Sequence, residues 1–320
     1  MPPSIRLVLL GTKDFALPTF EALFKLGRVA ALITQPDRPQ GRKQLLIPSR
    51  VKQAAIALGV PVHQPEEINS PEGVELVRSL NPDLLVTVAY GQILSAEVLS
   101  IPPLGGINLH GSILPKYRGA APVARAIQAG ETETGVTVIL MTPKVDAGGM
   151  IALARTAIDP DETAGELEAR LARLGPSMVL DAIERLEAGT VEILPQDQAH
   201  VTKAPKLRKE DGILDWSWSA RAVHNLIRAM NPWPLASTHW HPAEASKDPL
   251  RLIVHQSRVV EGQGAPGQVL VAEGNRLEVA AGHESVRLLT MQVPGKKAMP
   301  ADAYLRGHRV QVGDRFGESP

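Results

Sequence analysis

Two polar side chains that could act on a carbonyl group stand two residues apart, Asn108 and His110, at the end of the apolar segment 105–110. Side chains at positions i and i+2 of a strand share one face, so both point to the same place. Gly111 and Pro115 then interrupt the strand pattern. In open α/β sheets, ligands bind beyond the carboxyl ends of the strands. An amide and an imidazole placed there can stabilise an oxyanion and transfer a proton.

A third candidate, Asp146, follows the apolar strand pattern 135–141 in a glycine-rich loop. We expect Asp146 at the same ligand-binding edge of the sheet as His110. A carboxylate near His110 would orient the imidazole and favour its charged form. Each signal is weak when taken singly, because an Asp close to glycine is usually a turn residue. An isolated Asn-x-His is likewise most often a turn beside a surface histidine.

The elements that must position these residues alternate between strands and helices. The pattern predicts strands at 5–10, 29–34, 61–63, 83–89, 135–141 and 151–157, and helices at 15–26, 51–58, 72–80, 122–129 and 163–187. Such alternation indicates a mostly parallel sheet with helices on both faces. The first turn, residues 11–15, lacks both G-x-G-x-x-G and G-x-x-x-x-G-K-[ST], so neither a dinucleotide nor a nucleoside triphosphate is indicated.

The C-terminal part has a different character. Helical and strand patterns lapse over residues 190–207, and short alternating segments follow a helix predicted at 220–228. Predicted strands lie at 236–240, 250–254, 267–271, 276–280 and 285–292. Short strands separated by turns suggest a small barrel of the OB type. We therefore expect a catalytic domain over residues 1–189, a linker over 190–207 and a second domain over 208–320.

Composition narrows the classes of function. A chain of 320 residues suits about two domains. Its net charge of zero gives no support to a strongly basic nucleic-acid binder, although local basic clusters could form a groove for a nucleic-acid backbone or be solvated surface charge. The chain has no Cys, which excludes disulfides, thiolate catalysis and Cys-bound zinc. No apolar run approaches ~20 residues and no signal-peptide pattern opens the chain, so we expect a cytoplasmic protein.

Several long motifs resemble one family. Asn108, His110 and Asp146, together with the run 111–122 (Gly-Ser-Ile-Leu-Pro-Lys-Tyr-Arg-Gly-Ala-Ala-Pro), resemble the signature of formyltransferases that use 10-formyltetrahydrofolate. Further stretches resemble the methionyl-tRNA formyltransferase family: 35–39 (Gln-Pro-Asp-Arg-Pro), 88–91 (Val-Ala-Tyr-Gly), 231–234 (Asn-Pro-Trp-Pro), 294–299 (Pro-Gly-Lys-Lys-Ala-Met) and 306–309 (Arg-Gly-His-Arg). This resemblance implies a Rossmann-like catalytic domain followed by an OB-like tRNA-binding domain.

The resemblance also assigns roles. It implies that Asn108, His110 and Asp146 are catalytic, and that no metal is needed. The residues expected to bind the folate are Ser112, Ile113, Leu114, Pro115, Val88, Tyr90, Gly91 and Ile93. The basic residues expected to contact tRNA are Arg42, in a loop that enters the acceptor stem, and Lys203, Lys206, Lys209, Lys296 and Lys297.

The predicted reaction moves a formyl group from 10-formyltetrahydrofolate to the α-amino group of methionine on initiator Met-tRNA, for translation initiation. We expect the protein to act as a monomer. Two alternatives stay open at this point. One is a related enzyme that formylates an amino sugar carried on a nucleotide. The other is a non-catalytic module that binds tRNA or folate.

Overall fold

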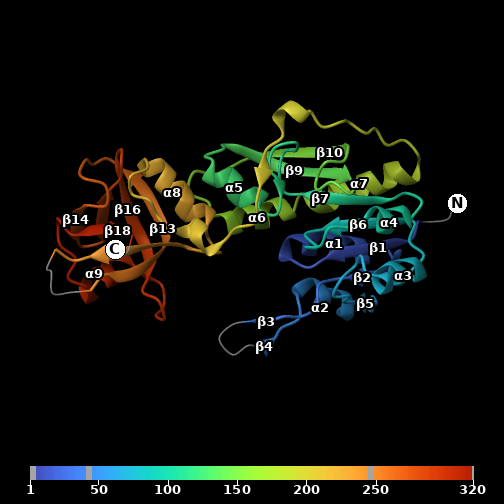
Figure 1. Ribbon diagram of the computed structural model, residues 1–320, viewed down its shortest axis with the longest axis horizontal. Coiled ribbons are helices and arrows are strands. Elements are labelled where there is room, and N and C mark those ends of the chain that lie inside the picture. Colours follow the sequence, from blue (N-terminus) through green and yellow to red (C-terminus); the bar gives the residue numbers. More distant parts are fainter. Residues whose placement is uncertain (1–4, 41–44, 244–247, 319–320) are drawn as a thin grey trace. The chain divides into compact units, whose positions relative to one another are not determined.

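The computed structural model describes residues 5–40, 45–243 and 248–318, and the chain forms two compact units (Figure 1). Unit 1 lies within Met1–Pro122, Glu133–Thr156 and Glu168–Pro205, and unit 2 lies within Val123–Thr132, Ala157–Leu167 and Lys206–Pro320. Two internal stretches therefore cluster with the C-terminal residues. The domain limits predicted from the sequence, with a linker over 190–207, stay a prediction.

Unit 1 is built on a sheet whose strand order is β10-β9-β7-β6-β1-β2-β5. These strands are β1 (Leu7–Gly11), β2 (Val29–Ile33), β5 (Val62–His63), β6 (Leu84–Val88), β7 (Gly106–His110), β9 (Glu133–Leu140) and β10 (Met150–Ala157). Strands β1, β2 and β6 are apolar at nearly every position because helices cover both faces of the sheet. The predicted α/β class with a mostly parallel sheet is confirmed.

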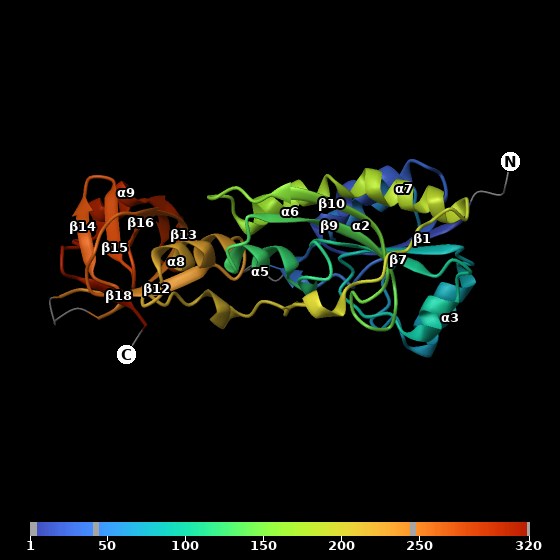
Figure 2. The ribbon, with the colours of Figure 1, turned by 90° about the horizontal axis from the view of Figure 1, so that it is seen from above.

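Helices cover the two faces of this sheet, and Figure 2 shows α7 on one side of β1 and β7 and α3 on the other. The helices are α1 (Leu17–Phe24), α2 (Arg50–Ala57), α3 (Pro71–Ser79), α4 (Ala96–Ser100) and α7 (Gly175–Glu187). The core beneath α3 and α4 joins Val74, Val77 and Val98 to Val8 and Leu85 of the sheet. Helices α1 and α7 pack against each other. Both layers thus hold the strand ends rigidly.

The strand order reverses beside β1, because β2 and β5 lie on one side of it and β6 and β7 on the other. Such a switch point is where open α/β sheets bind ligands. Beyond β7 the order continues into β9, which runs antiparallel to β7 with Ile107 opposite Leu140 and His110 opposite Thr137. The carboxyl end of β9 therefore lies beside Ile107, and Asp146 comes close to His110 through the loop that follows this strand.

The single helix predicted over 163–187 is also wrong, because the structure has α6 (Ala164–Ala172) and then α7 (Gly175–Glu187). Pro176 lies in the first turn of α7 and has no N–H to donate. A proline ring inside a helix clashes with the carbonyl four residues earlier, which here belongs to Ala172, the last residue of α6.

Further elements before residue 206 are short. They are η1 (Asp14–Ala16), β3 (Pro39–Gln40), β4 (Leu45–Leu46), β8 (Arg118–Gly119), α5 (Pro122–Gln128), η2 (Gln198–His200) and β11 (Lys203–Ala204). Strand β3 pairs with β4 in a hairpin, and β8 pairs with β11 in parallel. Among the described residues, no helix is long and apolar enough to cross a membrane.

Unit 2 is a nearly closed antiparallel barrel whose strand order is β14-β15-β16-β13-β12-β18, with β17 on β16. A hydrogen bond from the Val269 amide to the Asp314 carbonyl, 2.8 Å long, joins the two ends of this order. Its elements are η3 (Lys209–Gly212), α8 (Ala220–Ala229), β12 (Ala236–His241), β13 (Leu250–Val260), β14 (Val269–Glu273), β15 (Arg276–Ala280), β16 (Ser285–Gln292), β17 (Met299–Pro300), α9 (Ala301–Gly307) and β18 (Arg315–Gly317). The predicted small barrel is confirmed.

The predicted strand ended at residue 254, whereas β13 continues to Val260. Its pairing with β16 shifts register between Val254 and Gln256, and this irregularity interrupts the alternation of apolar and polar residues on which the prediction depended. Helix α8 packs on this strand and is polar on part of its buried side. His224 has a hydrogen-bond partner at each ring nitrogen, the Ser257 hydroxyl and the Pro160 carbonyl, both at 3.0 Å. Burial lowers the pKa of His224, and Arg228 and Arg221 act in the same direction, against the Pro160 carbonyl and Asp161.

We predict that protonation of His224 destabilises unit 2. Its folded pKa lies below its ordinary value of 6.5, so the unfolded chain binds the proton first as pH falls. The free energy of unfolding should therefore be constant above about pH 6.5 and fall as pH is lowered from there through the folded pKa. All four tryptophans lie after residue 206, so urea unfolding followed by their fluorescence reports this unit.

A His224→Gln variant should lose that pH dependence, whereas His283→Gln, at an exposed position of the same unit, should keep it. An unchanged pH profile in His224→Gln would show that His224 does not govern acid sensitivity.

Candidate functional site

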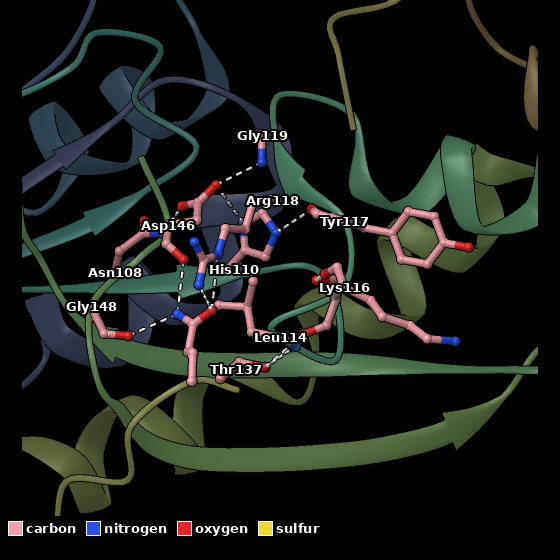
Figure 3. Close-up of polar contacts among 12 residues, drawn as sticks. Asn108, His110, Leu114, Lys116, Tyr117, Arg118, Gly119, Thr137, Asp146 and Gly148 are labelled. Carbon is pink, nitrogen blue, oxygen red and sulfur yellow. Dashed lines mark hydrogen bonds and ion pairs between the residues drawn. The ribbon is translucent and has the colours of Figure 1, made fainter. Parts of the chain in front are cut away.

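Asn108, His110 and Asp146, here called the polar trio, meet on one face of unit 1 (Figure 3). Asn108 and His110 both lie on β7, and the period-two geometry of the strand directs them together. The Asn108 amide nitrogen donates to one carboxylate oxygen of Asp146 over 3.4 Å. The other oxygen lies 3.4 Å from Nδ1 of His110. The structure therefore brings together the three residues predicted to be catalytic, whose catalytic role stays a prediction.

His110 has an acceptor at each ring nitrogen. Nε2 lies 2.9 Å from the Tyr117 carbonyl, and Nδ1 faces the Asp146 carboxylate. A neutral imidazole has one N–H and can donate to one of these acceptors, whereas the charged ring donates to both. His110 is 5% exposed, so these protein groups define its surroundings. Both ring nitrogens of His110 therefore face an oxygen of the protein.

Asp146 reaches the trio through the loop between β9 and β10. A loop leaves β9 at Leu140 and doubles back along β7 before β10 begins, and the Leu140 amide donates to the Gly149 carbonyl at 2.9 Å. Gly148 is required there because a Cβ would lie 1.8 Å from the Leu140 carbonyl oxygen. Asp146 itself has a φ of +49°, an uncommon value for a residue with a side chain. Its carboxylate also accepts the Gly119 amide at 2.8 Å.

The segment predicted to bind folate, residues 112–115, alternates between buried and partly exposed side chains. Ser112 and Leu114 are buried, while Ile113 and Pro115 are partly exposed. The buried Thr137 hydroxyl of β9 donates to the Ser112 carbonyl at 2.7 Å and accepts the Leu114 amide at 3.2 Å. Ser112 and Leu114 thus anchor the segment, so that Ile113 and Pro115 are the side chains left to touch a ligand.

The second predicted folate segment shows a similar division. Val88 is buried in β6, and Tyr90 points into the apolar core beside Val8 and Leu10, where burial raises the pKa of its phenol. Gly91 and Ile93 are exposed, and Ile93 shows 61% of its surface. The Asn69 amide holds the Ile93 carbonyl at 2.8 Å. The backbone around Gly91 and the Ile93 side chain are the parts of this segment available to a ligand.

The basic residues predicted to contact tRNA differ in their placement. Lys203 is exposed on β11 of unit 1. Four others are exposed in unit 2: Lys206, Lys209, Lys296 and Lys297. Arg42 lies outside the described residues. Exposure suits phosphate contacts, because a lysine side chain reaches a phosphate as a point charge.

Four contacts of the polar trio and its loops were not foreseen from the sequence. They come from the Gly119 amide, the Tyr117 carbonyl, the Thr137 hydroxyl and the Gln196 side chain. Two of these are backbone groups, which no residue type reveals. Tyr117 and Gly119 lie inside the long motif 111–122, which was the available signal. Gln196 lay in the stretch predicted to be a linker.

Among the described residues, no group of three or more His, Asp or Glu side chains could hold a metal ion.

The site is an Asn-His-Asp set suited to acyl transfer, on an α/β sheet that precedes a barrel. The family model for formyl transferases matches residues 6–183, and the model for the formyl transferase C-terminal domain matches residues 206–309. The chain therefore belongs to the formyl transferase family.

Within this family the chain is similar to methionyl-tRNA formyltransferases. It is 42% identical to that of Moorella thermoacetica over 98% of this chain and 99% of the relative. It is 45% identical to that of Ectopseudomonas mendocina over 97% of each chain. The fold also matches an N-formyltransferase from Helicobacter canadensis, crystallised with folinic acid and dTDP-3-aminofucose, with a TM-score of 0.64. That protein is 18% identical, over 89% of this chain and 98% of its own.

We predict that Thr137→Val loosens the segment 112–115. Valine keeps the shape and removes the hydroxyl, leaving the Ser112 carbonyl and the Leu114 amide without this partner. Such a loss at a buried site costs about 1–3 kcal/mol of unfolding free energy. Thermal and urea unfolding of the whole chain measure it, with exposed Thr190→Val as the control. Equal stability of the two variants would rule out an anchoring role for Thr137.

Proposed function

We propose that this chain transfers the formyl group of 10-formyltetrahydrofolate to the α-amino group of methionine on initiator Met-tRNA. The observation that carries the proposal is the polar trio, in which the Asp146 carboxylate lies 3.4 Å from both the Asn108 amide and the His110 imidazole. The identity of 42–45% with methionyl-tRNA formyltransferases over nearly the whole chain supports this acceptor. The amino-sugar alternative has weaker support, since the sugar N-formyltransferase neighbour is 18% identical.

In the proposed reaction the methionyl amine attacks the formyl carbon attached to N10 of the folate. A tetrahedral oxyanion forms, the bond from carbon to N10 breaks, and one amine proton ends on N10. The Asn108 amide holds Asp146 over a long 3.4 Å contact, so it can turn towards the oxyanion at little cost. The Nε2–H of His110 changes its acceptor from the Tyr117 carbonyl to the oxyanion, as catalytic hydrogen bonds often tighten only with substrate present.

Asp146 has two tasks in this scheme. Its carboxylate supports the charge on His110, and it accepts the amine proton directly or through a water molecule. An α-amino group has a reference pKa of about 7.7–8.0, so much of the amine is already a nucleophile near neutral pH. The Gly119 amide keeps one carboxylate oxygen in place during the transfer. No covalent intermediate with the protein is required.

The two substrates are proposed to bind different parts of the chain. The folate contacts Ile113, Pro115, Ile93 and the backbone at Gly91, which are the exposed members of the two predicted segments. The tRNA backbone contacts the exposed lysines of unit 2 and Lys203. We propose that the protein acts as a monomer. Charged initiator tRNA is used in translation, so we place the reaction in the cytoplasm.

We predict that the purified chain formylates initiator Met-tRNA with 10-formyltetrahydrofolate and leaves nucleotide-linked amino sugars unmodified, as measured by mass spectrometry. Asn108→Ala should fold normally and lose roughly 10²–10³ in kcat, the usual effect of removing an oxyanion donor. If the chain formylated only the amino sugar, the acceptor would be the amino sugar and not Met-tRNA. Near-normal turnover by the alanine variant would remove Asn108 from the mechanism.

We also predict that Lys296→Gln combined with Lys297→Gln weakens tRNA binding selectively. The tRNA KM should rise, and the log–log dependence of KM on salt should become shallower by about one unit for each lost phosphate contact. The KM for folate should not change, because the folate segments lie in unit 1. Lys25→Gln, at an exposed position of unit 1, is the control for loss of a surface charge outside unit 2. An unaltered salt slope would show that this pair does not touch tRNA.

A further inference from the structure

One side chain outside the polar trio holds the loop that presents Asp146. Gln196 lies in the extended stretch after α7 and is 7% exposed. Its Nε2 donates to the Asp146 carbonyl at 2.8 Å and to the Gly148 carbonyl at 2.7 Å. Both amide hydrogens are thus used on the backbone of the 146–148 turn. The reversed amide would set its oxygen against two carbonyl oxygens, so the surroundings fix the orientation of the amide.

The other end of the same amide holds Arg118. Oε1 of Gln196 accepts from Nε of Arg118 at 2.9 Å and from its Nη2 at 2.7 Å. Arg118 precedes Gly119, whose amide donates to the Asp146 carboxylate. Gln196 therefore connects the two loops that meet at the trio, and all four hydrogen-bonding positions of its amide are filled.

The rest of this stretch, residues 194–204, binds the same two loops through backbone groups and the Thr202 hydroxyl. Leu194 and Met150 exchange amide–carbonyl hydrogen bonds of 2.8 and 2.9 Å just after the Asp146 loop. The Thr202 hydroxyl accepts the Tyr117 amide at 2.8 Å, and its carbonyl accepts the Arg118 amide at 2.9 Å. Strand β11 then pairs with β8. Gln196 is the residue of the stretch that reaches the Asp146 turn itself.

The Asp146 turn needs such a holder. A non-glycine residue with positive φ is strained by about 1–3 kcal/mol and persists where its surroundings over-determine it. The contacts from Asp146 to Asn108 and His110 are both 3.4 Å, so a small rotation of this backbone would separate the carboxylate from the imidazole. A displacement of about 1 Å at a reacting group can cost on the order of 10²-fold in rate.

We propose that Gln196 is a positioning residue for formyl transfer, and that its amide clamps the carbonyls of Asp146 and Gly148 so that the Asp146 carboxylate faces His110. This role rests on the proposed function, since it acts through Asp146 and not through contact with a substrate. The essential hydrogen bonds are the two that the amide nitrogen donates to the Asp146 and Gly148 carbonyls. The two that the amide oxygen accepts from Arg118 align the amide.

The test compares Gln196→Met, which keeps the length and removes the amide, with Gln198→Met, an exposed glutamine two residues away. Gln196→Met should lower kcat by about 10- to 10²-fold with little change in either KM, while Gln198→Met should match the wild type. In an Asp146→Asn background, Gln196→Met should add little further loss, because both changes affect one unit. Fully additive losses, or a normal kcat, would overturn the proposal.

A second readout needs no substrate. The ¹⁵N signals of the His110 ring, assigned by comparison with His110→Asn, should move in Gln196→Met towards their positions in Asp146→Asn. They should be unchanged in Gln198→Met. Unmoved His110 signals would overturn the clamp even if activity fell. If the wild type fails to formylate Met-tRNA while these signals move, the proposed function fails and the positioning role stands.

Gln196→Glu separates the two halves of the amide and serves if the methionine variant does not fold. Its carboxylate keeps the contact with Arg118 but turns an oxygen towards the Asp146 and Gly148 carbonyls. This variant should lose kcat as Gln196→Met does. Wild-type kcat in Gln196→Glu would show that Arg118, and not the carbonyl clamp, is what Gln196 serves.

Discussion

The direction of β9 is the constraint on which the site depends. Because β9 runs antiparallel to β7, its carboxyl end lies beside Ile107 and away from His110. Asp146 can meet the imidazole only through a loop that doubles back along β7. That loop needs the close approach of Gly148 to the Leu140 carbonyl and the positive φ of Asp146. The position of the Asp146 carboxylate therefore depends on the residues that pack around this loop and not on β9 itself.

The supports of the trio come from stretches far apart in the chain. The loop 112–119 supplies the Gly119 amide and the Tyr117 carbonyl, and residues 194–204 fasten both loops through Gln196 and Thr202. Gly119 is part of this fastening, since a Cβ there would lie 2.6 Å from the Ala204 carbonyl oxygen. Catalytic groups must keep their geometry within fractions of an ångström. A network in which nearly every polar atom has a partner provides that rigidity.

Unit 2 uses buried polar groups in a comparable way. The Arg228 guanidinium donates to the Asp159 and Glu162 carbonyls and to the Asn225 side chain, next to the paired ring of His224. These contacts hold the stretch before α6 onto α8 within the same unit. Buried charges are costly unless every donor is satisfied, so such a network specifies one packing arrangement.

The sequence by itself determined the α/β class, the small barrel, and the shared face of Asn108 and His110. Apolar runs and a period of two are local properties, which survive in any packing. It did not determine the direction of β9, because an apolar strand has the same pattern in either direction. Pro176 is a local signal for the break between α6 and α7, whereas the apolar pattern over 163–187 predicted one helix. The role of Gln196 was decided by the tertiary structure alone, since it depends on where two backbone carbonyls point after loops distant in sequence have packed together.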